Sequence, residues 1–98
     1  MKVDFHPLVK RDLREILDYY DARSDVAGDR FFTAFEEAVR RILDAPMRCH
    51  PLDTQRRRCN LHKFPHHLVF EIEGDVVWIT VLRHDKRRPG FGLRRRMR

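Results

Sequence analysis

The sequence predicts a single α+β domain whose elements follow the order β-α-α-β-β-β. Three observations lead to this prediction. The chain of 98 residues, 42% hydrophobic and 37% charged, is long enough for one core and too apolar for a disordered segment. Two amphipathic helical patterns follow each other before Pro46. Two β-rich runs then flank Gly74-Asp75, a two-residue connection typical of a hairpin.

The first strand and the first helix are predicted within residues 1–23. Residues 1–5 alternate apolar and polar side chains, as a short strand does. Pro7 suits the first turn of a helix, where its missing N–H is not needed. The helix then runs for about four turns to near Arg23. Charged residues, among them Asp12, are expected on its solvent face, and its apolar face is formed by Val9, Leu13, Ile16, Leu17 and Tyr20.

The second helix is predicted to follow after a short connection. Ser24 and Asp25 offer an N-cap, and Pro46 ends the helical pattern. Two consecutive amphipathic helices with a short connection favour an antiparallel helical hairpin. Apolar side chains recur at intervals of three and four residues and are read as core: Phe32, Phe35, Val39, Ile42 and Leu43.

The remaining strands are predicted after a loop at residues 47–55. Residues 56–62 are expected to form a strand with a basic start. Residues 67–73 and 76–82 carry the strongest β signal and are joined by the hairpin connection. Because residues 76–82 are apolar on both faces, this strand is expected to be central and covered on both sides.

Positive charge is concentrated in the second half of the chain. The formal net charge is +6, but residues 1–45 carry 8 Lys/Arg and 10 Asp/Glu, whereas residues 46–98 carry 13 Lys/Arg and 5 Asp/Glu. The last 16 residues hold 8 of the basic groups and form a basic C-terminal tail. Such a field favours an acidic partner, either a phosphate backbone or an acidic protein segment. The alternative is that the charge serves solubility alone.

Other functional classes receive little support. Cys49 and Cys59 are expected to be a reduced pair, because the start of the chain lacks the apolar core of a secretory signal. Together with His50 and His62 they supply two thiols and two imidazoles, but this spacing matches zinc sites poorly. We therefore expect neither a metal nor a cofactor. No apolar run approaches the roughly 20 residues of a membrane span, so a cytoplasmic protein is expected.

Arginine and histidine side chains are predicted to converge where the strands meet. Arg56 and Arg58 lie on one side of the second strand, the third strand opens with His66 and His67, and Arg83 and His84 end the last strand. Arginine binds phosphate through its planar fork, and histidine moves a proton at neutral pH. This set suits a phosphodiester. The alternative for each residue is a solvated strand end, a polar turn or a partnered histidine at the rim of the sheet.

The chain resembles the RelE/ParE superfamily of bacterial type II toxins over nearly its whole length. The resemblance rests on the order of elements, on Asp29-Arg30-Phe31-Phe32 and Asp44-Ala45-Pro46 at the ends of the second helix, on the hairpin of residues 68–75, on Val81-Leu82-Arg83-His84, and on Arg87-Arg88-Pro89-Gly90-Phe91. It implies a helical hairpin packed on one face of a small curved antiparallel sheet. It also implies a toxin that inhibits growth and is neutralised by a cognate antitoxin in a hetero-oligomer.

The resemblance leaves two targets open. The RelE-like branch is similar to ribosome-dependent mRNA endonucleases, with Arg56, Arg58, His67, Arg83 and His84 as candidate catalytic residues. Phe91 stands where that branch often has a tyrosine, and phenylalanine has no proton to donate. The ParE-like branch resembles inhibitors of DNA gyrase, and the long helical pair with its Ala-Pro end favours this branch.

Two further expectations complete the sequence-based hypotheses. In either branch the target or antitoxin is expected to contact the tail, which is treated as flexible over residues 89–98, through Arg87, Arg88, Phe91, Arg94 and Arg95. If the chain is a nuclease, Arg83→Ala and His84→Ala should each relieve toxicity without unfolding it. A non-toxic nucleic-acid-binding module remains a further alternative, and it predicts a steep salt dependence of binding.

Overall fold

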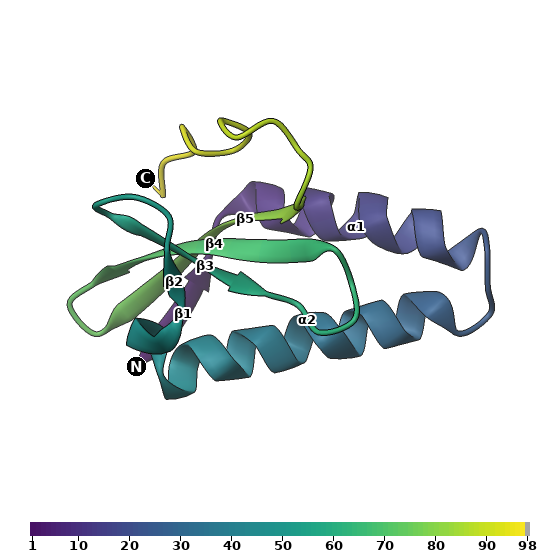
Figure 1. Cartoon of the computed structure of the whole chain (residues 1–98), viewed down its shortest axis with the longest axis horizontal. Helices are drawn as coiled ribbons and strands as arrows, with labels where there is room; N and C mark the ends of the chain where they lie inside the picture. Colours follow the sequence, from purple (N-terminus) through teal and green to yellow (C-terminus); the bar gives the residue numbers. More distant parts are fainter. Residues whose placement is uncertain (98) are drawn as a thin grey trace.

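The protein consists of two helices packed on a five-stranded sheet (Figure 1). The computed structural model describes residues 1–97. The helices α1 and α2 run antiparallel and join at the end of the molecule away from the chain termini. A short 3-10 helix at Pro46–Arg48 follows α2. The elements are β1 (Lys2–Phe5), α1 (Pro7–Asp21), α2 (Ala27–Asp44), β2 (His50–Pro51), β3 (Arg56–Asn60), β4 (His66–Glu73) and β5 (Val76–His84).

The α+β class and the order of the predicted elements are confirmed, with one addition and one correction. The two-residue strand β2 lies in what was expected to be a loop. The sheet order is β1-β5-β4-β3-β2, and β1 pairs with β5 in parallel, so the sheet is mixed rather than purely antiparallel. A short hairpin forces its two strands to be antiparallel, as it does for β4 and β5. No such constraint acts on β1, because most of the domain separates it from β5.

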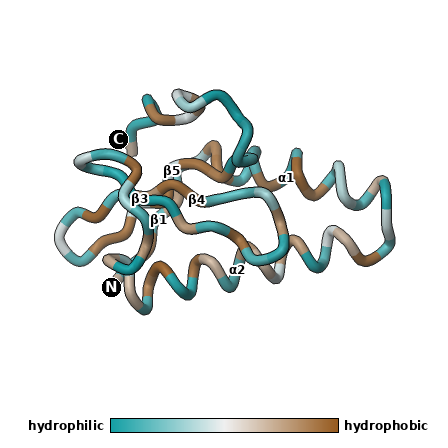
Figure 2. Tube along the Cα trace, viewed as in Figure 1, coloured by the Kyte–Doolittle hydropathy of each residue, from teal (hydrophilic) through white to brown (hydrophobic). Residues whose placement is uncertain are grey.

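The core lies between the helices and one face of the sheet. Strand β5 lies in the interior of the sheet between β1 and β4, as expected of a covered strand, and Val77 and Ile79 are fully buried on it. Phe31 and Ile42 of α2 are also fully buried, and hydropathy along the chain trace shows this apolar side of α2 (Figure 2). Ala38, which has no exposed surface, lets α2 approach the sheet closely. Burial of these side chains is the main stabilising contribution to the fold.

The helix boundaries differ from the sequence-based prediction by a few residues. The helix α1 begins at Pro7, and His6 caps it by accepting a hydrogen bond on Nδ1 from the Leu8 N–H at 3.1 Å. It ends at Asp21 rather than near Arg23. The N-cap of α2 is Val26, so the prediction of a cap at Ser24 or Asp25 is wrong. The Ser24 hydroxyl instead accepts from the Val26 N–H at 3.3 Å and closes the turn between the helices.

The tail, residues 85–97, folds back over the face of the sheet opposite the helices, which we call the outer face. Val69 and Val81 are fully buried although they do not belong to the core on the helix side. Gly92 covers Val81 so closely that a Cβ atom on it would lie 2.5 Å from a Val81 methyl carbon. The described part of the tail therefore forms a second layer on the sheet, and residue 98 of the predicted flexible segment lies outside the described residues.

An ion pair between Asp12 and Arg95 holds the tail against α1 and β5, and we call it the clasp. The Arg95 guanidinium binds both carboxylate oxygens of Asp12, at 2.6 and 2.9 Å, and it also donates to the Thr80 carbonyl at 3.0 Å. Asp12 further accepts from the Leu82 N–H at 3.1 Å. The expectation that Asp12 faces solvent is wrong, since only 7% of it is exposed. The clasp thus provides hydrogen-bond partners for the backbone groups of Thr80 and Leu82 on β5, beyond the point where the pairing with β1 ends.

Replacing Gly92 with alanine is expected to destabilise the fold more than replacing Gly74. Both glycines have positive φ angles, +78° and +62°, so alanine at either position incurs a conformational cost of about 1 kcal/mol. Only Gly92 approaches another side chain, and its steric conflict with Val81 should add about 1–3 kcal/mol. Urea unfolding of the two variants measures the difference. Equal losses would show that the tail does not cover Val81 in solution.

Candidate functional site

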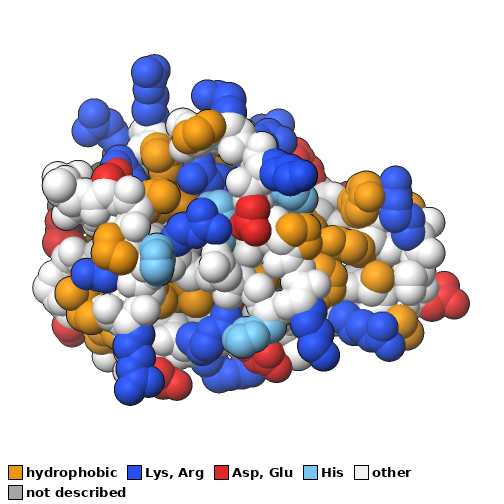
Figure 3. Space-filling model, in the orientation of Figure 1, with side chains coloured by type: hydrophobic (Ala, Val, Ile, Leu, Met, Phe, Trp, Pro, Cys, Tyr) orange, Lys and Arg blue, Asp and Glu red, His pale blue; other side chains and the backbone are white. Residues whose placement is uncertain are grey.

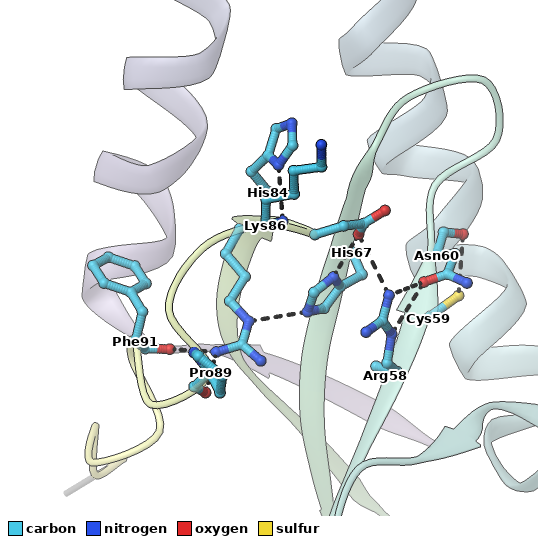
Figure 4. A network of polar contacts seen from close by, with 10 residues as sticks. Arg58, Cys59, Asn60, His67, His84, Lys86, Pro89 and Phe91 are labelled. Atoms are coloured by element: carbon cyan, nitrogen blue, oxygen red, sulfur yellow. Dashed lines mark hydrogen bonds and ion pairs between the residues drawn. The ribbon is translucent and has the colours of Figure 1, made fainter.

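The residues Arg58, Asn60, His67, Arg83 and Asp85 form a connected network on the outer face, which we call the polar cluster (Figure 4). The strand register brings them together, because Asn60 pairs with His67 and His67 pairs with Arg83 across three neighbouring strands. Asp85 follows directly after β5 and reaches back to His67 and Arg58. Of the five candidate catalytic residues, Arg58, His67 and Arg83 thus lie together.

His67 is a buried connector in this cluster, with both ring nitrogens engaged. Its Nε2 lies 3.0 Å from Nε of Arg83, which always carries a proton, so Nε2 is the acceptor. The proton therefore resides on Nδ1 and is donated to the Asp85 carboxylate at 2.8 Å. Burial lowers the pKa of His67, and the Asp85 carboxylate opposes that shift. With 1% of its surface exposed, the ring has no lone pair turned toward a substrate.

Arg83 holds the start of the tail in place. Only 5% of its surface is exposed, and burial lowers its pKa. One terminal nitrogen donates to the carbonyl oxygens of Pro89 at 2.7 Å and Phe91 at 2.9 Å, while Nε donates to His67. Arg83 thereby joins β4, β5 and the tail in one hydrogen-bonded unit. Its geometry is that of a positioning residue rather than that of an exposed phosphate ligand.

Arg56 and Arg58 of β3 share the outer face, as predicted, but each already has partners. Arg56 pairs with Asp53 at 2.8 Å and with Glu71 at 3.7 Å, and it also donates to the Leu93 carbonyl at 2.8 Å. Arg58 donates to the Asn60 side chain at 2.8 Å and lies 3.4 Å from Asp85. The neighbouring carboxylates therefore neutralise part of the positive charge that would be required to bind a phosphate at this position.

His84 lies on the helix side of the sheet and is separated from the polar cluster. It pairs with His66 in the strand register, and the two rings meet edge to face at 5.0 Å. Its Nδ1 accepts a hydrogen bond from the Lys86 N–H at 3.0 Å. His84 is therefore not assembled with Arg58, His67 and Arg83.

His66 is buried in an aromatic cluster in which its ring meets Tyr20, Phe31 and His84, and Phe64 packs on Tyr20 and Phe31. Its ring lies 5.0 Å from that of Phe31, and Nδ1 has no hydrogen-bond partner among residues 1–97. Burial, together with the neighbouring His84, lowers the pKa of His66 to about 4. The ring is therefore neutral at physiological pH and packs as an aromatic side chain.

Stability is expected to fall as the pH decreases from 6.5 toward 4, in part because of His66. The unfolded chain binds a proton at this histidine near pH 6.5, whereas the folded chain binds it only near pH 4. Protonation in this window thus favours the unfolded state, by up to about 3 kcal/mol. The variant His66→Phe should flatten the pH dependence of urea unfolding, whereas His62→Gln, at an exposed position, should retain it. An unchanged slope in His66→Phe would contradict the assignment.

The outward part of the tail carries the exposed positive charge. Lys and Arg side chains project along it in the space-filling view (Figure 3), and the exposed ones are Lys86, Arg87, Arg88, Arg94 and Arg96. The Arg87 guanidinium stacks on the Phe91 ring at 3.9 Å, with Arg95 and Arg88 at 5.3 and 5.9 Å from the ring centre. Of the predicted contact residues, Arg95 forms the clasp with Asp12. Arg87, Arg88 and Arg94 are exposed, and Phe91 is half-buried beneath the Arg87 guanidinium.

A groove of about 830 Å³ lies between the tail and the outer face. Trp78 and Met97 provide apolar lining, and Arg56 and Glu71 provide charge. Within the described residues no group of three or more His, Cys, Asp or Glu side chains is placed to hold a metal ion. No helix in residues 1–97 is long and apolar enough to cross a membrane.

Sequence reasoning missed Asp85 and Asn60 as members of the cluster. Asp85 had a usable signal, because it is the one carboxylate within the basic stretch of residues 83–88. An isolated acidic residue among cations is commonly an internal partner of one of them. Asn60 had no comparable signal, since its role depends on the pairing of β3 with β4.

A match to a family model shows that the protein is a toxin of the RelE/ParE superfamily, and the fold agrees with this class. Residues 3–89 match the family described as ParE toxin of type II toxin-antitoxin system, parDE, and the chain belongs to this family. A solved structure titled chromosomal ParDE TA system from P. aeruginosa is similar with a TM-score of 0.64 and 16% identity. The match covers 86% of this chain and 95% of that one. No curated protein sequence matches the chain.

Proposed function

We propose that this toxin arrests growth by binding and inhibiting DNA gyrase, and that a cognate antitoxin neutralises it. The observation that carries the choice of mechanism is the state of His67, whose two ring nitrogens are occupied by Arg83 and Asp85. A general base needs a free lone pair within reach of the proton that it removes. The polar cluster therefore favours a structural and binding role over cleavage of a phosphodiester.

Two further features support inhibition by protein contact. Phe91 supplies no hydroxyl, and its ring is covered by the Arg87 guanidinium. The side chain of His84, the remaining candidate base, packs against His66 on the helix side. The exposed arginines of the tail form a surface that can meet an acidic protein patch through charge-assisted hydrogen bonds.

The antitoxin segment is proposed to combine acidic and apolar side chains. The groove beside Trp78 offers apolar surface next to Arg94 and Arg96. A segment that becomes ordered on binding would place apolar groups in the groove and carboxylates beside the arginines. Such a complex would have the composition of a toxin–antitoxin hetero-oligomer.

The decisive experiment expresses the chain without a partner and follows growth, plasmid supercoiling and mRNA integrity in the same culture. Growth arrest with relaxed or linearised DNA and intact mRNA is the expected result. Codon-spaced cuts in translated mRNA would instead support the ribosome-dependent endonuclease. Normal growth with correctly folded protein would contradict both mechanisms. The remaining hypothesis would then be a non-toxic nucleic-acid-binding module.

Charge reversal on the tail should weaken inhibition without unfolding the protein. The variant Arg87→Glu/Arg88→Glu removes two exposed cations and should raise the concentration needed to inhibit purified gyrase by about tenfold. A matched control, Arg11→Glu/Arg14→Glu, makes the same change in charge on the exposed face of α1. Thermal unfolding of both variants verifies the fold. Equal inhibition by both variants would exclude the tail as the contact surface.

A further inference from the structure

The cysteines Cys49 and Cys59 lie next to the polar cluster, where the Cys59 thiol contacts the Asn60 carbonyl at 3.9 Å. The register of β2 and β3 places the two cysteines opposite each other. His50 pairs with Arg58, and Pro51 pairs with Arg57. One step back along the same antiparallel register, Cys49 faces Cys59. Both line one cavity of about 420 Å³, and Cys49 packs against the core cluster that contains Cys59. The thiols are free, and they are close enough to form a side-chain hydrogen bond with each other.

The hydrogen-bond pattern defines what kind of cross-strand pair these cysteines form. Paired positions of an antiparallel ladder alternate between hydrogen-bonded and non-hydrogen-bonded pairs. The Leu52 N–H donates to the Arg56 carbonyl at 2.8 Å, so position 52 belongs to a hydrogen-bonded pair. Pro51 has no N–H and therefore fits the next, non-hydrogen-bonded position. Cys49, two residues away from Pro51, shares that type.

A non-hydrogen-bonded pair is the geometry that accommodates a disulfide across two strands. Its Cα atoms lie about 4.5 Å apart, within the range of about 4.4–6.8 Å found for disulfides. The side chains also point to the same face of the sheet, because the residues are directly opposite. Closing a bond between Cys49 and Cys59 therefore requires rotation of side chains rather than movement of the backbone.

We propose that Cys49 and Cys59 are a redox modification site that closes to an intramolecular disulfide with low-molecular-weight disulfides such as oxidised glutathione. Cys49 is half-buried, so its sulfur attacks the small disulfide first and releases one thiol. The buried Cys59 sulfur then attacks Cys49 and releases the second thiol. Two electrons pass from the protein thiols to the small disulfide, and their two protons end on the two released thiols.

The surroundings make this reaction slow at neutral pH. Burial, reinforced by the neighbouring Cys59, raises the pKa of Cys49 to about 11, and the thiolate is the attacking species. Arg41 donates a hydrogen bond to the Cys59 sulfur at 3.8 Å and so lies beside the thiol that attacks second. The disulfide is thus a product of sustained oxidising conditions and not of a brief exposure.

The disulfide would fix the loop that presents the β3 arginines. Asp53 accepts hydrogen bonds from the backbone and the side chain of Arg56 within this loop. Linking residues 49 and 59 ties both ends of the segment together, next to Arg58. Oxidation would therefore stabilise the chain without altering the exposed arginines of the tail.

Redox titration of the purified wild-type chain tests the proposal. The protein is equilibrated in glutathione buffers at alkaline pH, with and without concentrated urea, then quenched with acid and analysed by mass spectrometry. The native chain should lose two hydrogens in a monomer. Its equilibrium constant for disulfide formation should exceed that of the urea-unfolded chain by about 100-fold, which is the gain expected for an unstrained loop of this length.

Thermal unfolding provides a second measurement on the same samples. The oxidised protein should melt on the order of 10 °C above the reduced protein. The variant Cys49→Ser is the control, and its melting temperature should not respond to glutathione. Equal equilibrium constants in the native and unfolded chains would overturn the proposal. So would a predominance of glutathione adducts or disulfide-linked dimers on the native wild-type chain.

Discussion

Replacing Asp12 with alanine is expected to lower the free energy of unfolding by about 3–5 kcal/mol. The carboxylate is 7% exposed and binds the Arg95 guanidinium through both oxygens. Its removal leaves a largely buried cation and the buried Leu82 N–H without their partner. The loss would be a large share of the total stability of a domain of this size. Urea unfolding followed by circular dichroism measures it.

A matched control lies on the same helix. Asp18 pairs with Arg14 at 3.5 Å, but both side chains are about two-thirds exposed, so Asp18→Ala should cost less than about 0.5 kcal/mol. The double variant Asp12→Ala/Arg95→Ala should be more stable than the sum of the two single losses predicts, because it removes the uncompensated charge. If Asp12→Ala costs no more than Asp18→Ala, the clasp does not form in solution.

The second large effect is expected for Arg83→Ala, with a loss of about 3 kcal/mol. The guanidinium satisfies Nε2 of His67 and the carbonyl oxygens of Pro89 and Phe91, all at the boundary between β5 and the tail. Without it these acceptors lose a charged donor, and the tail should detach from the outer face. Chemical unfolding gives the loss, and hydrogen exchange of the tail amides reports the detachment.

The matched control for Arg83 is Arg87→Ala. Arg87 is exposed and stacks on Phe91, so its removal should cost less than about 1 kcal/mol. This contrast bears on the nuclease hypothesis, which expects Arg83→Ala to relieve toxicity without unfolding the chain. Because Arg83 is buried and holds the tail, a loss of toxicity in that variant alone does not identify a catalytic residue. An equal effect of both substitutions on stability would contradict the structural role of Arg83.

Local patterns predicted the elements of the fold well, but not the contacts between distant segments. The periodic apolar residues of α2 and the Gly74-Asp75 connection are local signals, and both lead to the correct elements. The N-cap of α2 was misplaced because Ser24 and Asp25 suit turns as well as caps. The parallel pairing of β1 with β5 depends on the whole domain, and no local pattern encodes it.

For the candidate site, too, the positions of residues on the strands were predictable and their contacts with distant residues were not. The alternation of strands correctly placed Arg56 and Arg58 on one face, and the register brought Arg58, His67 and Arg83 together. Apart from Asp85, the partners of these residues were not predictable, because an arginine that faces solvent and an arginine that pairs with a distant carboxylate look the same in the sequence. The clasp joins residues 83 positions apart. Its only local signal is that Asp12 lies beside the apolar stripe of α1.

The pairing of β1 with β5 determines when the toxin becomes a folded molecule. Lys2–Phe5, made early, pair with Val76–Ile79, and the tail that covers the outer face comes later still. Contacts between such distant residues slow folding, and a nascent chain that ends before β5 leaves β1 without its partner strand. Synthesis interrupted before β5 therefore yields no partly active toxin. A newly made chain passes through an interval in which a chaperone, a protease or an antitoxin meets it unfolded.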